Sequence, residues 1–177
     1  NTPDWDIVFL MVNTTMYGGT GGTFATFSRN QLSIEIALHE IGHSFAGLSD
    51  EYWAGFQFAN ENTNMTQDTD PTTIIWSQWL YDNGVGIYQY ESPGTDWYRP
   101  HQDCKMRYLE TPFCPVCSEQ TIKTIYSILN LTGNYLPEYT EINLPANGSE
   151  YFQINPIPTI PNTIKIDWLL NDELIFE

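Results

Sequence analysis

The motif His39-Glu-Ile-Gly-His43 constrains this chain more than any other feature. It lies in a segment whose apolar residues recur at helical spacing, and Gly47 follows as a left-handed stop. The apolar stripe consists of Ile34, Leu38, Ile41, Phe45 and Leu48. A spacing of four residues places both imidazoles on one helix face, where they can bind one metal ion, and Glu40 lies beside the open coordination position. We therefore predict a helix that binds zinc.

A third protein ligand is expected, because a catalytic zinc ion usually has three. Gly47 lets the chain leave the helix and return, and Asp50 stands three residues after it. We favour Asp50 as the third ligand. Its neighbour Glu51 is the main alternative, and a residue further along the chain, such as His101, is another.

Composition and charge exclude several classes of partner. The 177 residues include 41% hydrophobic residues, yet no run is long enough to predict a membrane span. Six Lys and Arg residues stand against 22 Asp and Glu residues, for a net charge of −16. This charge repels phosphate backbones and anionic lipid, so we expect no nucleic-acid or membrane-surface partner. We also expect a monomer.

The elements along the chain indicate an α+β fold in two parts. We predict a buried strand at 6–12, a glycine-rich turn at 17–22, an exposed edge strand at 23–28, the zinc-binding helix, a short helix at 73–81 and a second long helix at 116–129. Residues 54–103 are irregular and rich in aromatic residues, which pack an interior or, alternatively, form a binding surface. The predicted first domain covers 1–133.

The predicted second part, residues 134–177, has a different character. Short strands are expected at 139–144, 150–154, 163–170 and 174–176, separated by turns that contain proline, glycine or Asn171-Asp172. This pattern is typical of the opening strands of a β-sandwich (immunoglobulin-like) module.

Three cysteines, Cys104, Cys114 and Cys117, are the only ones in the chain. A redox pair usually accompanies a βαβ pattern, which is absent, and a zinc knuckle needs four ligands where only three cysteines exist. We therefore expect a disulfide from Cys104 to Cys114 or Cys117, which an exported protein permits.

Three motifs together resemble one known family. They are His39 to Tyr52, with the sequence HEIGHSFAGLSDEY; Asp103-Cys-Lys-Met-Arg-Tyr108; and Phe113-Cys-Pro-Val-Cys117. In this order they look like the IgA-peptidase family of bacterial zinc metallopeptidases, igalysin-type enzymes that belong with the metzincins. The resemblance spans roughly residues 5 to 130. It implies a metzincin-like domain with a twisted sheet and an active-site helix, in a secreted or cell-surface bacterial protein.

The resemblance also implies roles for two residues near Cys104. Met106 matches the methionine that packs beneath the zinc ion, and Tyr108 matches a tyrosine that some metzincins place near the metal. One departure from the metzincin pattern is that Gly47 follows the second histidine one residue late, which keeps Glu51 in contention as a ligand.

The expected activity is a zinc-dependent endopeptidase acting on extracellular proteins, such as immunoglobulins or other host polypeptides and glycoproteins. Zinc polarises the scissile carbonyl and activates a water molecule, and Glu40 accepts the proton of that water. The substrate is expected to lie extended against the edge strand 23–28 by β-augmentation, beside glycines that form either an adaptable rim or a simple hairpin turn. The alternative is a catalytically silent, zinc-containing module that binds glycoprotein or glycan.

Overall fold

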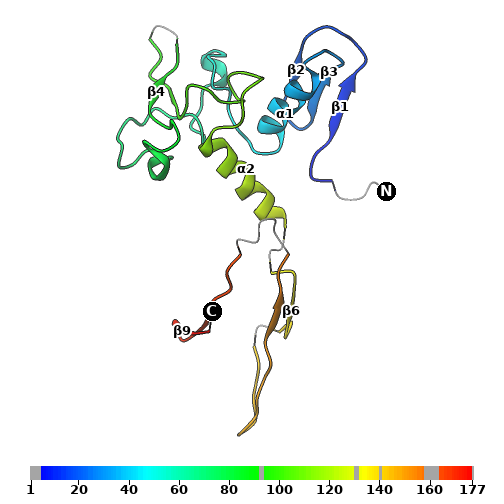
Figure 1. Ribbon diagram of the computed structural model, residues 1–177, viewed down its shortest axis with the longest axis vertical. Helices are drawn as coiled ribbons and strands as arrows, with labels where there is room; N and C mark the ends of the chain where they lie inside the picture. The colour runs from blue at the N-terminus through cyan, green and yellow to red at the C-terminus, as the bar shows by residue number, and fades with distance from the viewer. Residues whose placement is uncertain (1–4, 92–93, 130–131, 140, 158–163, 177) are drawn as a thin grey trace. The chain divides into compact units, whose positions relative to one another are not determined.

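A computed structural model describes residues 5–91, 94–129, 132–139, 141–157 and 164–176. The chain forms two compact units, Asn1–Ile128 and Leu129–Glu177. Both helices and strands are present, so the fold is mixed α and β, as predicted (Figure 1). None of the helices in the described parts is long and apolar enough to cross a membrane.

A three-stranded sheet lies beside the zinc-motif helix in the first unit (Figure 1). Its strands are β1 (Phe9–Val12), β2 (Gly19–Thr20) and β3 (Ala25–Ser28), in the order β1-β3-β2. β3 pairs in parallel with β1 and antiparallel with β2. The prediction that 23–28 forms an edge strand is therefore wrong: β3 is central, and β1 and β2 are the two edges of this sheet. Strand order depends on non-local pairing, which alternation along one strand cannot indicate.

The first strand differs from its prediction in burial. The apolar run at 6–12 indicates a buried strand, but all four residues of β1 are exposed, Met11 by 64%. β1 pairs only with β3 among the described strands, so it is an edge of this sheet. An apolar run of strand length predicts that a strand forms, but it does not show whether other elements pack on the faces of that strand.

Helix α1 (Ser33–Ser44) carries the zinc motif and ends where predicted, just before Gly47, which has a φ of +66°. Its buried face is not the predicted one. Ile34 is 73% exposed and Leu38 is 39% exposed, whereas the buried residues are Ile36, His39, Glu40 and Gly42. The helix thus turns its polar motif, not its whole apolar stripe, toward the rest of the unit.

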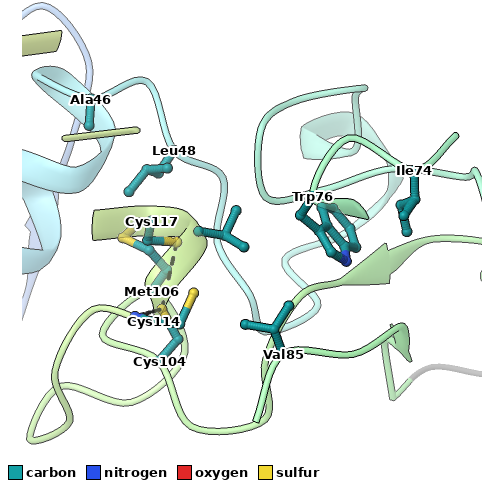
Figure 2. Close-up of a cluster of buried hydrophobic side chains, with 10 residues drawn as sticks. Ala46, Leu48, Ile74, Trp76, Val85, Cys104, Met106, Cys114 and Cys117 are labelled. Carbon is teal, nitrogen blue, oxygen red and sulfur yellow. Dashed lines mark hydrogen bonds between the residues drawn. The ribbon is translucent and has the colours of Figure 1, made fainter. Parts of the chain in front are cut away.

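The aromatic segment at 54–103 is mostly irregular and helps to form the core. It contains two short 3-10 turns, η1 (Phe56–Phe58) and η2 (Ser77–Trp79), and a small antiparallel pair, β4 (Tyr88–Gln89) and β5 (Tyr98–Arg99). The helix predicted at 73–81 is reduced to η2. Figure 2 shows core residues from this segment, Ile74, Trp76 and Val85, facing Leu48 and the cysteines. Trp76 is completely buried, which favours the interior-packing interpretation of these aromatic residues.

Helix α2 (Pro115–Ile128) follows the cysteines, as predicted, and buries only its first turn, at Val116 and Cys117. The second unit contains two antiparallel pairs, β6 (Asn134–Leu136) with β7 (Gln153–Asn155) and β8 (Trp168–Leu170) with β9 (Glu173–Phe176). The predicted turn at Asn171-Asp172 joins β8 to β9, with positive φ at both residues. The described residues of the predicted strand 139–144 form no strand, whereas β6 was not predicted; residues 140 and 163 lie outside the described part. A β-sandwich stays a prediction.

Candidate metal centre and cleft

Three side chains from the zinc motif and the segment after it converge on one point. His39 Nε2 and His43 Nε2 lie 3.2 Å apart. Asp50 Oδ1 lies 3.1 Å from the first nitrogen and 3.2 Å from the second. Two ligands of a tetrahedral zinc ion, each about 2.0–2.1 Å from the metal, are about 3.3 Å apart. The triangle of donor atoms therefore has the dimensions of three zinc ligands.

The hydrogen bonds of the two imidazole rings indicate which ring nitrogen of each histidine carries the proton. Nδ1 of His39 lies 2.9 Å from the Lys105 carbonyl oxygen, and Nδ1 of His43 lies 2.7 Å from that of Leu48. A carbonyl oxygen only accepts hydrogen bonds, so each Nδ1 carries the ring proton and each Nε2 of a neutral ring presents a lone pair. Three electron-pair donors within 3.2 Å of one another can surround one cation, so the site fits a zinc ion.

Asp50 is the third member of this set and Glu51 is not. The chain turns at Gly47, and Asp50 then faces the histidines while Tyr90 donates a hydrogen bond to its backbone carbonyl at 2.7 Å. Burial raises the pKa of Asp50, but the two imidazoles, which become cationic when protonated, lower it to about 2. His101, the more distant alternative, contacts the Asn83 carbonyl instead.

Glu40 lies beside the three donors, in the wall of a cleft of about 370 Å³. Burial raises the pKa of its carboxyl above the ordinary value of 4.5, although His39 and His43 oppose the shift. A carboxylate with a raised pKa is a stronger base than a free glutamate, so Glu40 is suited to accept a proton. A larger cavity of about 670 Å³ in the second unit has no comparable cluster of acids and histidines.

The glycine-rich segment forms the opposite wall of the cleft. A methyl group on Gly19 would lie 2.5 Å from Glu40 Oε1 and 2.5 Å from Ile36 Cγ2. One on Gly21 would overlap His43, with ring atom Cγ at 2.9 Å. The glycines are therefore neither only a hairpin turn nor only an adaptable rim: they let the edge strand approach the motif helix at the distance of bare backbone.

Met106 and Lys105 support the helix from behind. Met106 is fully buried, and its Sδ packs so closely on Gly42 that a side chain there would overlap it. Met106 therefore packs directly against the motif helix, and its place beneath a metal ion stays a prediction. Lys105 offers its carbonyl to His39, and its buried ammonium pairs with Glu35. The sequence did not indicate Lys105, because its contact with His39 is made by a backbone carbonyl, which every residue type has.

Tyr108 does not line the cleft. It is 48% exposed, and the Arg107 guanidinium lies over its ring, 4.6 Å from the ring centre. Tyr52 lines the cleft instead, with its ring parallel to that of His39 at a centroid distance of 6.4 Å. Burial, Asp50 and Glu40 raise the pKa of Tyr52, so its hydroxyl stays protonated. The prediction of Tyr108 as the tyrosine near the metal is thus not supported by its position.

All three cysteines are free, so the structure contains none of the predicted disulfides. Cys104 Sγ and Cys117 Sγ are 3.7 Å apart, whereas a disulfide bond requires about 2.05 Å. The thiols surround the carboxylate of Glu51, which is completely buried. Burial raises the pKa of Glu51 well above its ordinary value. Only the non-local return of the chain brings Glu51 to the cysteines, and no spacing signal indicates it.

Comparison with known proteins bears on the zinc motif directly. The model of the family described as IgA Peptidase M64 matches residues 1–87, which include His39, Glu40, His43 and Asp50. This part of the chain, just under half of the 177 residues, is similar to that family. The resemblance inferred from the motifs is thereby confirmed for this part of the chain. No curated protein matches the chain with significance.

Similarity to the IgA peptidase family over residues 1–87 suggests a peptidase, a hydrolase of peptide bonds whose substrate is a polypeptide. The matched residues supply the two histidines and both carboxylates of the cleft, together with the glycines opposite them. Met106 and the three cysteines lie after the matched part. Their contribution to the site rests on the packing described above.

Proposed function

We propose that this protein is a zinc-dependent endopeptidase in which His39, His43 and Asp50 hold the metal and Glu40 is the general base. One observation carries the proposal: three electron-pair donors converge at zinc-ligand spacing, and a carboxylate of raised pKa stands beside them in an open cleft. Similarity to a peptidase family supports the same reaction class.

A zinc ion held by these residues supplies Lewis acidity to a water molecule and to the scissile carbonyl. Glu40 accepts a proton from the attacking water and transfers it to the amine that leaves. Its burial favours this exchange, because a carboxyl group with a raised pKa is easier to reprotonate between the two transfers. The Lys105 and Leu48 carbonyls fix the orientation of both histidines during the cycle.

The substrate backbone is proposed to lie along β2, the strand that forms the sheet edge at the cleft. An extended peptide can pair with the free backbone groups of Gly19 and Thr20 by β-augmentation. Gly21 and Gly22 also line the cleft and have no side chain to obstruct the peptide. We therefore propose β2 in place of β3 as the strand that binds the substrate, because β3 is paired on both sides.

Tyr52 is proposed to take the role that the resemblance gave to Tyr108. Its hydroxyl stays protonated at neutral pH and lines the cleft next to Glu40. A neutral hydroxyl in this place can donate a hydrogen bond to the carbonyl oxygen as negative charge develops there. Tyr52→Phe is then expected to lower kcat while the chain still binds zinc.

The wider setting follows from the resemblance and is part of the same proposal. Residues 1–133 form a metzincin-like catalytic domain, and residues 134–177 begin an immunoglobulin-like accessory module. The protein is secreted or held at a bacterial cell surface, is monomeric, and cleaves extracellular host proteins or glycoproteins.

Cleavage of a diverse peptide library by the zinc-loaded chain tests the function. Products are sequenced by mass spectrometry in parallel for wild type, Glu40→Gln and the control Glu110→Gln, which changes an exposed carboxylate outside the cleft. We expect internal cuts from wild type and the control, and a loss of at least about 100-fold in Glu40→Gln at unchanged zinc content. Equal cleavage by Glu40→Gln and wild type contradicts the assignment of the base.

The second candidate is a zinc-containing binding module for glycoprotein or glycan. Exposed aromatic side chains near the cleft, such as Tyr52 and Phe58, favour it. Wild type that retains zinc in the cleft but makes no cut in the library would support this candidate.

A further inference from the structure

A second cluster of ligand-type residues lies in the core, away from the cleft. Glu51, Cys104, Cys114 and Cys117 are all buried, and their ligand atoms all lie within 4.8 Å of one another. Figure 2 shows the three cysteines gathered around the start of α2, close to Met106. These residues come from three segments: the chain after α1, the turn that contains Met106, and the first turn of α2.

The distances within the cluster match a metal site. Two thiolates bound to tetrahedral zinc at about 2.3 Å lie about 3.8 Å apart, and a thiolate and a carboxylate oxygen about 3.5 Å apart. Cys104 and Cys117 are separated by 3.7 Å between their Sγ atoms. Glu51 Oε1 lies 3.1 Å from Cys117 Sγ and 3.9 Å from Cys114 Sγ. These three distances are close to those between ligands of one ion, and the other ligand atoms of the cluster lie within 4.8 Å of one another.

The carboxylate of Glu51 gives an independent indication of a cation. Its Oε2 is buried and has no hydrogen-bond partner, and Oε1 receives a hydrogen bond from Asn64 at 3.2 Å. No lysine or arginine pairs with it in the part of the chain that the structure describes. A buried carboxyl oxygen without a hydrogen-bond partner is unfavourable, and a cation bound at this position would give Oε2 a partner.

The cluster also contains groups that can stabilise thiolates once a metal ion is bound. The Cys114 backbone N–H points to Cys104 Sγ at 3.3 Å, as a donor to sulfur. Cys114 immediately precedes α2, and Cys117 lies in its first turn, where the helix dipole stabilises negative charge. Soft thiolate donors in a closed, four-ligand arrangement are typical of structural zinc.

We propose that Glu51, Cys104, Cys114 and Cys117 bind a structural zinc ion, distinct from the ion in the cleft. Binding converts three thiols to thiolates and releases their protons to solvent, and no redox step is involved. The site is closed, because the four side chains fill a tetrahedral shell and all are buried.

This ion would fix the parts that shape the cleft. Glu51 follows Asp50 directly, and its backbone N–H donates to the Met106 carbonyl at 2.8 Å. Cys104 precedes Lys105, whose carbonyl orients His39. A zinc ion between these segments holds the third cleft ligand and the support beneath the motif helix in register. The proposal does not depend on peptide cleavage.

Metal analysis of the full chain tests the proposal. The protein is purified under reducing conditions, equilibrated with zinc and desalted, and zinc is measured by elemental mass spectrometry. We expect two zinc ions per chain in wild type and in the control Ser118→Ala, and one in either Cys117→Ser or His43→Ala. One ion in wild type that is lost in His43→Ala overturns the proposal, whatever the outcome of the cleavage assay.

Cobalt provides a readout that does not need a cysteine variant to fold. Co²⁺ bound by thiolates gives an intense charge-transfer absorption in the near ultraviolet, which histidine and carboxylate ligands do not. We expect this band in wild type and in His43→Ala, together with at least about tenfold slower reaction of the thiols with a disulfide reagent when metal is bound. Absence of the band in both proteins, or thiol reactivity that is indifferent to metal, refutes the site.

Discussion

The contact between Gly42 and Met106 allows a sharp test of the packing beneath the metal. A methyl group on Gly42 would lie 3.2 Å from Met106 Cε and 3.3 Å from Phe113 Cε1, and closer still to Met106 Sδ. Ordinary contacts between such atoms need about 3.5–4.0 Å, so the fully buried Met106 has to move by roughly 1 Å. Overpacking of this kind costs about 1–3 kcal/mol.

An opposing effect comes from the helix itself, because alanine is favoured over glycine in a helix interior by about 1 kcal/mol. We therefore expect Gly42→Ala to lower the free energy of unfolding by a net of about 0–2 kcal/mol. The control Ala37→Gly, in the same helix, measures the propensity difference separately. Unfolding is followed in urea by tryptophan fluorescence on the zinc-loaded chain.

The Met106→Ala background distinguishes overpacking from other causes. Truncation of this methionine alone costs about 2–5 kcal/mol, because it leaves a cavity. In that background the methyl group introduced at position 42 has room, so Gly42→Ala should stabilise the chain by about 1 kcal/mol. The coupling energy between the two substitutions is then about 1–3 kcal/mol, the overpacking cost itself. Equal effects of Gly42→Ala in both backgrounds would refute the contact.

Three further predictions follow from other contacts. Gly47 has a φ of +66° and open space around it. Gly47→Val should therefore lower the free energy of unfolding in urea by about 1–2 kcal/mol, and Gly47→Asn should lower it clearly less. Equal losses in the two variants would contradict the left-handed conformation at this position. Gly21→Ala should weaken zinc binding about tenfold or more in chelator competition, because its methyl group displaces His43, whereas Thr20→Ala should not. The Trp79 indole N–H and Lys123 lower the pKa of Glu119 below its ordinary 4.5, despite slight burial. The ionised Glu119 therefore stabilises the fold fully above about pH 4.5, and this stabilisation is lost as pH falls through the lowered pKa. Acid should then reduce the free energy of unfolding of wild type more than that of Glu119→Gln, measured by urea unfolding at each pH. Parallel pH profiles of the two proteins would contradict this role of Glu119.

The sequence was most informative where the chemistry is local. A helix of about three turns holds His39 and His43 one turn apart, and the following Gly47 fixes how soon Asp50 can return, so three residues in one short segment were predicted and the structure brings them together. The same local reasoning predicted the Asn171-Asp172 turn in the second unit. Such features depend on residues within one or two turns of the chain.

Predictions failed where the outcome depends on distant segments. Ile34 fits the apolar stripe of α1 but is exposed, because the buried side of the helix is set by the glycine-bearing strand and by Met106. The strand β3 is central because it pairs with both β1 and β2, an arrangement that no periodicity within 23–28 can reveal. The predicted disulfide failed for a similar reason: counting cysteines alone omitted the carboxylate that completes their cluster.

Asp50 and Glu51, the two alternatives for the third ligand in the cleft, lie in two different groups of donor atoms. The two carboxylates are adjacent in sequence, yet Asp50 lies within 3.2 Å of both histidines and Glu51 lies within 3.9 Å of two cysteines. Each carboxylate completes a separate group of donors, and the peptide bond between them links the cleft to the core. A displacement of Glu51 is therefore transmitted directly to Asp50, so that the packing around the thiols sets the geometry at which the histidines and Asp50 converge.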